Sequence, residues 1–236
     1  MSHPRPATVA TAAIRASRDL LLAHAVDYAG ARGTFHWPEL QEFNFALEWF
    51  DVVAAENPGR PAVQIVSADL SVRSWSYGEL SRRSDQVANW LSGLGIRRGD
   101  HVIVMLGNTI ELWETMLGLT KIGAVAIPTS TLLSPSDLAY RAKKGEARAI
   151  ITLGALADRV ADLPGRILRL AVGAEGAGAP GIPGVPAGWH DFADSADASD
   201  DFEPDGPTPA GDASLLYFTS GTTSRPKLVQ HTHVSY

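Results

Sequence analysis

The sequence has no cysteine among its 236 residues. This absence excludes disulfide bonds, thiolate metal ligands and a thioester formed on a side chain of the protein itself. If the protein makes a thioester, the thiol must therefore come from a cofactor or a partner. A chain without cysteine is compatible with a reducing compartment, and no secretory signal pattern is present. We therefore expect a cytoplasmic protein.

Long apolar runs and a surplus of positive charge are also missing. No stretch approaches the roughly 20 consecutive apolar residues that a membrane helix needs, so we expect no membrane span. The net charge of −6 argues against a nucleic-acid-binding protein, which usually carries a basic face. Residues 1–18 contain three arginines and no acidic residue, which resembles a weak organelle-targeting composition. We interpret them as a surface helix with a frayed start.

Lysine and arginine are absent from Ala171 to Ser224, and glycine, proline, alanine and aspartate dominate residues 173–211. A segment of this composition cannot bury enough apolar surface to fold by itself. We predict a long surface segment with, at most, a short strand near Trp189. The acidic run from Asp191 to Asp205 could be a partner site, but a solvated loop is the simpler interpretation.

Apolar strands alternate with amphipathic helices over most of the remaining chain. The patterns predict helices at residues 8–31, 38–56, 76–93, 110–122 and from 134 onward, and strands at residues 62–66, 72–75, 101–106, 123–128, 149–153, 167–172 and 214–218. The first two strands fit a β-hairpin, whereas the later strands are short apolar runs. Buried strands that alternate with helices indicate an α/β fold with a mostly parallel sheet flanked by helices.

Several side chains have a structural interpretation. Ser76, with Glu79 three residues later, fits a helix capping box. Ser134 before Pro135 fits the start of another helix. Four tryptophans fall on apolar faces and are expected in the core, namely Trp49, Trp75, Trp90 and Trp113.

Residues 215–227 carry the strongest chemical pattern. An apolar strand runs directly into a hydroxyl-rich turn that ends with Pro226 and Lys227. Backbone N–H groups and short hydroxyls donate hydrogen bonds in such a turn, Gly221 lets a ligand approach closely, and Lys227 adds positive charge. This combination suits a polyanion, of which a nucleoside triphosphate is the commonest. The competing interpretation is a turn whose hydroxyls satisfy its own backbone.

A Walker A loop, Gly-x-x-x-x-Gly-Lys-Ser/Thr, is the first alternative for this turn. Counted from Gly221, Pro226 stands where the second glycine should be, and Leu228 stands where the magnesium-binding hydroxyl should be. Proline has no N–H group to offer a phosphate, and leucine cannot ligate a hard cation. We therefore reject this alternative.

Residues 219–227, Thr-Ser-Gly-Thr-Thr-Ser-Arg-Pro-Lys, resemble the phosphate-loop signature Thr-Ser-Gly-Ser/Thr-Thr-Gly-x-Pro-Lys of the adenylate-forming superfamily. That superfamily includes acyl-CoA synthetases, adenylation domains of peptide synthetases and firefly luciferase. Ser224 stands where the family has a glycine, and a positive φ there would strain a serine by roughly 1 kcal/mol. The family places a Thr-His pair at the start of the next helix, and Thr232-His233 falls at that spacing.

Shorter upstream segments resemble the same superfamily in the same order. Residues 75–80, 99–102 and 121–128 are similar to its Thr-Tyr-x-Glu-Leu, Gly-Asp-x-Val and Gly-Ala-x-x-x-Pro segments. Residues 43–46 and 132–135 look closest to medium-chain acyl-CoA and benzoate-CoA ligases. The resemblance therefore covers most of the chain.

The resemblance implies an incomplete N-terminal domain of the adenylate-forming fold at residues 37–236, after an N-terminal helical extension at residues 1–36. Within this AMP-binding domain, residues 173–211 would be the surface segment and residues 215–227 the phosphate loop. The family's acyl pocket, adenine and ribose contacts, hinge and catalytic lysine lie downstream of the phosphate loop. We therefore expect the chain by itself to be inactive.

The resemblance also implies a reaction with ATP, Mg²⁺ and coenzyme A. A small carboxylic acid attacks the α-phosphorus of ATP to give acyl-AMP and pyrophosphate, and the thiol of coenzyme A then displaces AMP. The phosphate loop would hold the β- and γ-phosphates and neutralise charge on the departing pyrophosphate. The implied contacts are the hydroxyls of Thr219, Ser220, Thr222 and Thr223, the close approach at Gly221 and the charge of Lys227.

Two alternatives to an acyl-CoA synthetase stay open. One is a non-catalytic nucleotide-binding or interaction module that reuses the fold, and the other is an adenylation domain with a different acceptor. His231 and His233 could be catalytic bases, but a structural role is the simpler interpretation because neither has an evident acid partner in the sequence. The full-length form could be a homo-oligomer.

Overall fold

The computed structural model describes residues 5–163, 165–173, 184–219 and 226–235. Their centre is a seven-stranded sheet with the order β7-β6-β5-β3-β4-β8-β9. Its strands are β3 (His101–Met105), β4 (Val125–Pro128), β5 (Ala149–Leu153), β6 (Leu168–Val172), β7 (His190–Asp191), β8 (Ala213–Thr219) and β9 (Lys227–Thr232). Neighbouring strands are parallel from β7 to β8, and β9 is antiparallel to β8. The predicted α/β fold with a mostly parallel sheet is confirmed.

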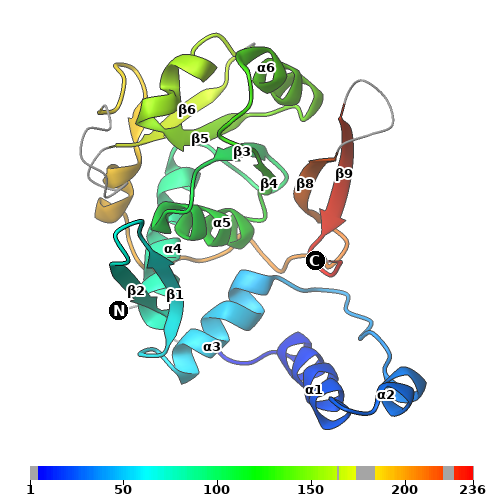
Figure 1. Cartoon of the computed structure of the whole chain (residues 1–236). Helices are drawn as coiled ribbons and strands as arrows, with labels where there is room; N and C mark the ends of the chain where they lie inside the picture. Colours follow the sequence, from blue (N-terminus) through cyan, green and yellow to red (C-terminus); the bar gives the residue numbers. More distant parts are fainter. Residues whose placement is uncertain (1–4, 164, 174–183, 220–225, 236) are drawn as a thin grey trace.

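Helices cover both faces of this sheet (Figure 1). One face carries α4 (Tyr77–Gly93) and α5 (Ile110–Ile122), and the other carries α6 (Pro135–Lys144) and the 3-10 helix η2 (Gly154–Val160). Along β3, Val102 and Val104 pack with the α4 and α5 cluster, whereas Ile103 and Met105 pack with the α6 cluster. This alternation is the pattern of a sheet buried on both faces. None of the helices that the structure describes is long and apolar enough to span a membrane.

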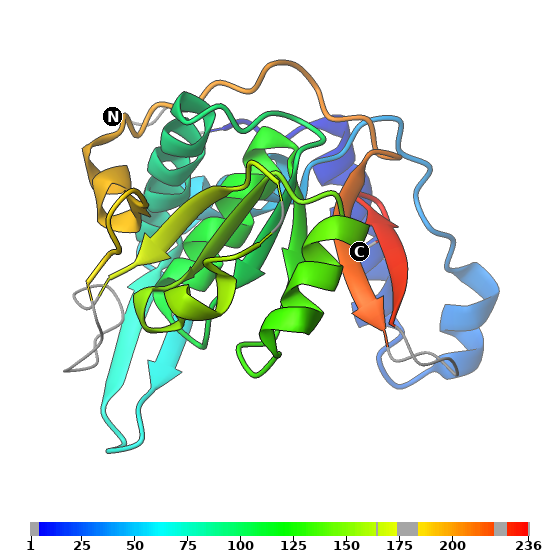
Figure 2. The same cartoon turned by 90° about the horizontal axis from the view of Figure 1, so that it is seen from above.

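A separate hairpin leads into α4. It consists of the antiparallel strands β1 (Pro61–Val66) and β2 (Val72–Ser76), as predicted, and Figure 2 shows it on the side away from β8 and β9. The predicted capping box is present, because Ser76 Oγ accepts a hydrogen bond from Glu79 N–H and the Glu79 carboxylate accepts one from Ser76 N–H at 2.8 Å. At α6, Ser134 is the N-cap and Pro135 the first helical residue, also as predicted.

The sequence predicts a single helix at residues 8–31, but the structure has two helices in this region. It forms α1 (Val9–Ala23) and α2 (Tyr28–Thr34). The break has a local cause, because the Asp27 side chain accepts a hydrogen bond from Gly30 N–H at 2.9 Å and thereby starts a new helix.

The prediction of a helix at residues 38–56 is wrong for residues 38–44. Helical structure begins at Phe45 as the π-helical turn η1 (Phe45–Phe50) and continues as α3 (Asp51–Glu56). Asn44 Oδ1 accepts hydrogen bonds from the N–H groups of Ala46 and Leu47, and this side-chain cap fixes the start. Phe43, the residue before Asn44, stays outside the helix because its N–H donates a hydrogen bond to the Thr208 carbonyl at 2.9 Å.

The acidic segment is better packed than predicted. The short strand expected there is present as β7, and the 3-10 helix η3 (Phe192–Asp197) follows it. Phe192 and Phe202 are only 3% and 6% exposed and belong to the core. Gln86 on α4 donates hydrogen bonds to the carbonyls of Ala196 and Ala198 at 2.7 and 3.1 Å. The interpretation of residues 191–205 as a solvated loop is therefore wrong at its two phenylalanines.

The tryptophans are less buried than predicted. Trp113 is 44% exposed, so its expected place in the core is wrong. It lies on the outward side of α5, whose neighbouring residues Leu117 and Ile110 face the core. The other three, Trp49, Trp75 and Trp90, are half-buried and pack against core clusters, as expected.

A buried ionic cluster, which the sequence does not reveal, joins α3, α4 and α5. Lys121 on α5 is completely buried. Its Nζ lies 2.9 Å from Asp51 Oδ1 and 2.7 Å from Asp85 Oδ1, and donates a hydrogen bond to the Ser81 carbonyl. Burial raises the pKa of Asp85 to about 6, although the Lys121 charge acts in the opposite direction. One lysine thus holds carboxylates from two other helices.

Candidate functional site

The β8–β9 hairpin carries both ends of the predicted phosphate loop. Thr219, the last residue of β8, pairs with Lys227, the first residue of β9. Because β8 is parallel to β4, Thr219 lies at the carboxyl edge of the parallel strands. Open α/β sheets bind their ligands outside this edge. The loop is therefore attached where the fold favours a ligand.

The structure describes only part of the predicted site. Thr219 and Lys227 are both exposed. No ion pair links Lys227 to another residue in the described ranges. Ser220, Gly221, Thr222 and Thr223, with Ser224 and Arg225, lie outside the described residues. The site thus has one hydroxyl and one ammonium side by side at its base, and the roles of the other residues stay predictions.

Helix α6 holds the hairpin where the loop ends. Tyr140 Oη donates a hydrogen bond to the Pro226 carbonyl at 3.3 Å. The Tyr140 ring also meets Phe218 edge-on, with 6.2 Å between ring centres. From the next position, the Arg141 guanidinium lies 4.6 Å from the centre of the Phe218 ring. These contacts fix the base of the loop on a rigid element, which favours a preorganised binding site.

Strand β9 is not among the strands predicted from the sequence, although the composition of its residues is compatible with a strand. Its sequence Lys-Leu-Val-Gln-His-Thr contains two β-branched residues, and Leu228 packs against the α6 cluster. Thr232 ends the strand, and residues 233–235 form a turn. The start of a helix expected at Thr232-His233 is therefore not found in the described residues.

The two histidines after the loop lie away from its base. His231 meets the Tyr217 ring edge-on, with 5.7 Å between ring centres. His233 is only 3% exposed, and neither of its ring nitrogens has a hydrogen-bond partner among the described residues. Burial lowers the pKa of His233 to about 4, against the opposing effect of Asp212. This environment fits a neutral imidazole in a packing role.

The buried His233 predicts a pH dependence of stability. An unfolded histidine has a pKa of about 6.5, so the unfolded chain takes up the proton first as the pH falls. The stability that neutral His233 contributes is present above about pH 6.5 and is lost as the pH falls toward 4. In urea denaturation, the free energy of unfolding should fall between pH 7 and pH 4.5 by about 2 kcal/mol less for His233→Phe than for wild type.

The exposed His36 provides the matched control for this measurement. His36→Phe should keep the wild-type dependence of the unfolding free energy on pH. If His233→Phe also keeps it, His233 is not buried in its neutral form.

Comparisons with known proteins place the chain in a family. The family model described as AMP-binding enzyme matches residues 50–236. The mitochondrial acyl-coenzyme A synthetase ACSM5 of Rattus norvegicus is 32% identical over 84% of this chain and 35% of its own length. The uncharacterized acyl-CoA ligase YtcI of Bacillus subtilis is 32% identical over 68% of this chain and 28% of its own length. The chain thus spans about a third of the relatives' length.

Solved structures show the same relationship in three dimensions. The acyl-CoA synthetase of Brucella canis has a TM-score of 0.64 and 30% identity, over 74% of this chain and 31% of the other. A benzoate CoA ligase from Burkholderia xenovorans LB400 has a TM-score of 0.63 and 26% identity, over 81% of this chain and 35% of the other. The family expected from the phosphate-loop signature is confirmed, and the chain belongs to the AMP-binding enzymes, of which it covers the N-terminal part.

Proposed function

We propose that this chain is the N-terminal part of an ATP-dependent acyl-CoA synthetase. The complete enzyme would join a carboxylic acid to ATP, release pyrophosphate, and transfer the acyl group from acyl-AMP to the thiol of coenzyme A. The observation that carries the proposal is the pairing of Thr219 with Lys227 at the carboxyl edge of the sheet. The similarity to named acyl-CoA synthetases supports coenzyme A as the acceptor of the acyl group.

The chain's own contribution would be to bind the phosphates of ATP. The hydroxyls of the loop would donate hydrogen bonds, Gly221 would permit close approach, and Lys227 would place its charge beside the departing pyrophosphate. Mg²⁺ would supply further neutralisation through the phosphate oxygens. The proposed hydroxyl donors are those of Thr219, Ser220, Thr222 and Thr223.

The proposed domain boundaries are those inferred from the sequence. Residues 1–36 would form the helical extension and residues 37–236 the first part of the AMP-binding domain. The acyl pocket, adenine contacts, hinge and catalytic lysine would lie in the part of the relatives that this chain does not cover. Homo-oligomer formation by the full-length enzyme and a cytoplasmic location stay predictions, and several curated relatives are named mitochondrial.

Acid-dependent exchange between labelled pyrophosphate and ATP tests the proposal. The full-length enzyme should catalyse exchange with a suitable carboxylic acid and should form acyl-CoA once coenzyme A is added. The 236-residue chain should show neither activity, because the proposed catalytic lysine is not part of it. Exchange by the chain alone would refute its predicted inactivity. The proposed function would be refuted if the full-length protein catalysed no exchange between pyrophosphate and ATP with any carboxylic acid tested.

A further inference from the structure

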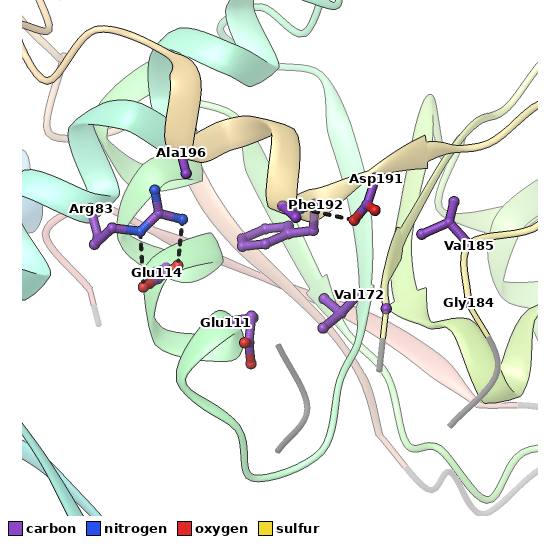
Figure 3. Close-up of a pocket in the computed structure, with 11 residues that line it drawn as sticks. Arg83, Glu111, Glu114, Val172, Gly184, Val185, Asp191, Phe192 and Ala196 are labelled. Carbon is purple, nitrogen blue, oxygen red and sulfur yellow. Dashed lines mark hydrogen bonds and ion pairs between the residues drawn. The ribbon is translucent and has the colours of Figure 1, made fainter. Parts of the chain in front are cut away.

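A cavity lies on the α4 and α5 face of the sheet, near the carboxyl end of β6 (Figure 3). Its volume is about 560 Å³, which is within the range of pockets that bind small molecules. Its walls come from α4, α5, the end of β6, residues 184–185, β7 and η3. Four strand spacings of about 4.8 Å, or about 19 Å, separate β6 at the cavity wall from β8, which leads into the phosphate loop. The cavity is therefore a distinct site.

Two of the three carboxylates that line the cavity already have partners. Glu114 forms a two-pronged ion pair with Arg83, with contacts of 3.0 and 3.3 Å. Arg83 also donates to the Ser195 hydroxyl, which holds the guanidinium in place. Asp191 accepts a hydrogen bond from Ala193 N–H at 2.9 Å and so caps η3. These groups are used by the fold itself.

Glu111 is the carboxylate of which the fold leaves one oxygen without a hydrogen-bond partner. It is 5% exposed, and its Oε2 has no hydrogen-bond partner among the described residues. Burial raises the pKa of the Glu111 carboxyl, against the opposing effects of hydrogen bonds from its own backbone N–H and from the Thr109 hydroxyl. Its place in the first turn of α5 gives only the partial stabilisation of a helix N-terminus. A buried carboxylate oxygen without a hydrogen-bond partner is costly unless a ligand supplies one.

The rest of the wall near Glu111 is apolar. Phe192 and Val172 are 3% and 1% exposed, and Figure 3 shows both on the same cavity as Glu111. The Phe192 ring is fixed by an edge-on contact with Trp90, with 5.7 Å between ring centres. An aromatic ring attracts a cation as well as apolar groups. The wall therefore suits a ligand that combines a positive charge with an apolar body.

We propose that this cavity binds a small organic ammonium ion, with its nitrogen on Glu111 Oε2 and its apolar body against Phe192 and Val172. Three carboxylates against one guanidinium disfavour an anion. A divalent metal ion would need several oxygen ligands, and no group of three metal-ligating side chains occurs among the described residues. The site is independent of the phosphate loop and of the proposed synthetase activity.

Binding of 2-phenylethylammonium to the purified chain, measured by isothermal titration calorimetry, tests the proposal. The neutral analogue 2-phenylethanol has the same apolar body without the charge. We expect saturable binding of the ammonium, with the alcohol about tenfold weaker or more, because a hydrogen bond to a charged group is lost. Glu111→Gln should weaken binding of the ammonium by a similar factor while it keeps the shape of the side chain.

Glu203→Gln is the matched control, since Glu203 is an exposed carboxylate outside the cavity. It should bind the ammonium as wild type does. If Glu111→Gln fails to fold, Ala193→Trp replaces it, because this exposed wall residue would fill the cavity and should abolish binding while Glu111 is kept. The proposal is overturned if the ammonium does not bind, if the alcohol binds equally well, or if the variant that folds binds like wild type.

Discussion

Lys121→Met is expected to lower the free energy of unfolding by about 3–5 kcal/mol. The substitution keeps an unbranched side chain in a completely buried position but removes the cation that Asp51 and Asp85 share at 2.9 and 2.7 Å. Two carboxylates would then remain buried with Arg5, 3.3 Å from Asp51, as the nearest cation. Urea denaturation at pH 8 measures the loss. This is the largest stability effect that we expect from a single substitution.

Two further variants separate lost charge compensation from lost packing. Lys144→Met, at an exposed position on α6, should leave the unfolding free energy unchanged. Adding Asp85→Asn to Lys121→Met should recover part of the loss, because it removes one of the uncompensated charges. Loss of Lys121 also favours protonation of Asp85, whose pKa burial already raises to about 6, so the destabilisation should be smaller at pH 5 than at pH 8. A pH-independent loss with no recovery would show that packing dominates.

Lys227→Ala in the full-length enzyme should lower kcat for adenylation by about 100- to 1000-fold, the range found when one stabilising donor to a developing charge is removed. Lys227 is exposed at the base of the loop, so its removal should not change the unfolding free energy. The KM for the carboxylic acid should also stay the same, because the proposed contact is with the phosphates. Initial rates of acid-dependent pyrophosphate release measure both constants.

Lys144→Ala is the control for this kinetic experiment, because it removes an exposed lysine from α6 without touching the hairpin. It should have wild-type kcat. A fall of less than about threefold for Lys227→Ala would contradict the role of Lys227 as a charge clamp, since it corresponds to under about 0.7 kcal/mol of transition-state stabilisation.

The parts of the fold that local chemistry decides are the parts that the sequence predicts well. Short apolar runs mark β3 and β5, because strands buried on both faces have no polar side. The Ser76 and Glu79 capping box fixes the start of α4 through hydrogen bonds within four residues. Asn44 shows the limit of this approach, because its cap overrides a helical spacing of apolar residues that begins before it.

Features that depend on distant partners could not be predicted in the same way. The composition of α5 does not reveal that Lys121 is buried between carboxylates from two other helices. The spacing of Thr219 and Lys227 gives the family signature, but their pairing requires the antiparallel register of β8 and β9. Glu111 looks like an ordinary helix N-terminal acid, and only the tertiary structure buries it beside a cavity.

The central claim is that the loop between Thr219 and Lys227 binds the triphosphate of ATP. A crystal structure of the full-length enzyme with Mg²⁺ and a non-hydrolysable ATP analogue tests it most directly. We expect the β- and γ-phosphate oxygens within about 3 Å of Lys227 Nζ and of the Thr222 and Thr223 hydroxyls. A triphosphate bound elsewhere, such as at the carboxyl ends of β5 and β6, would contradict the claim.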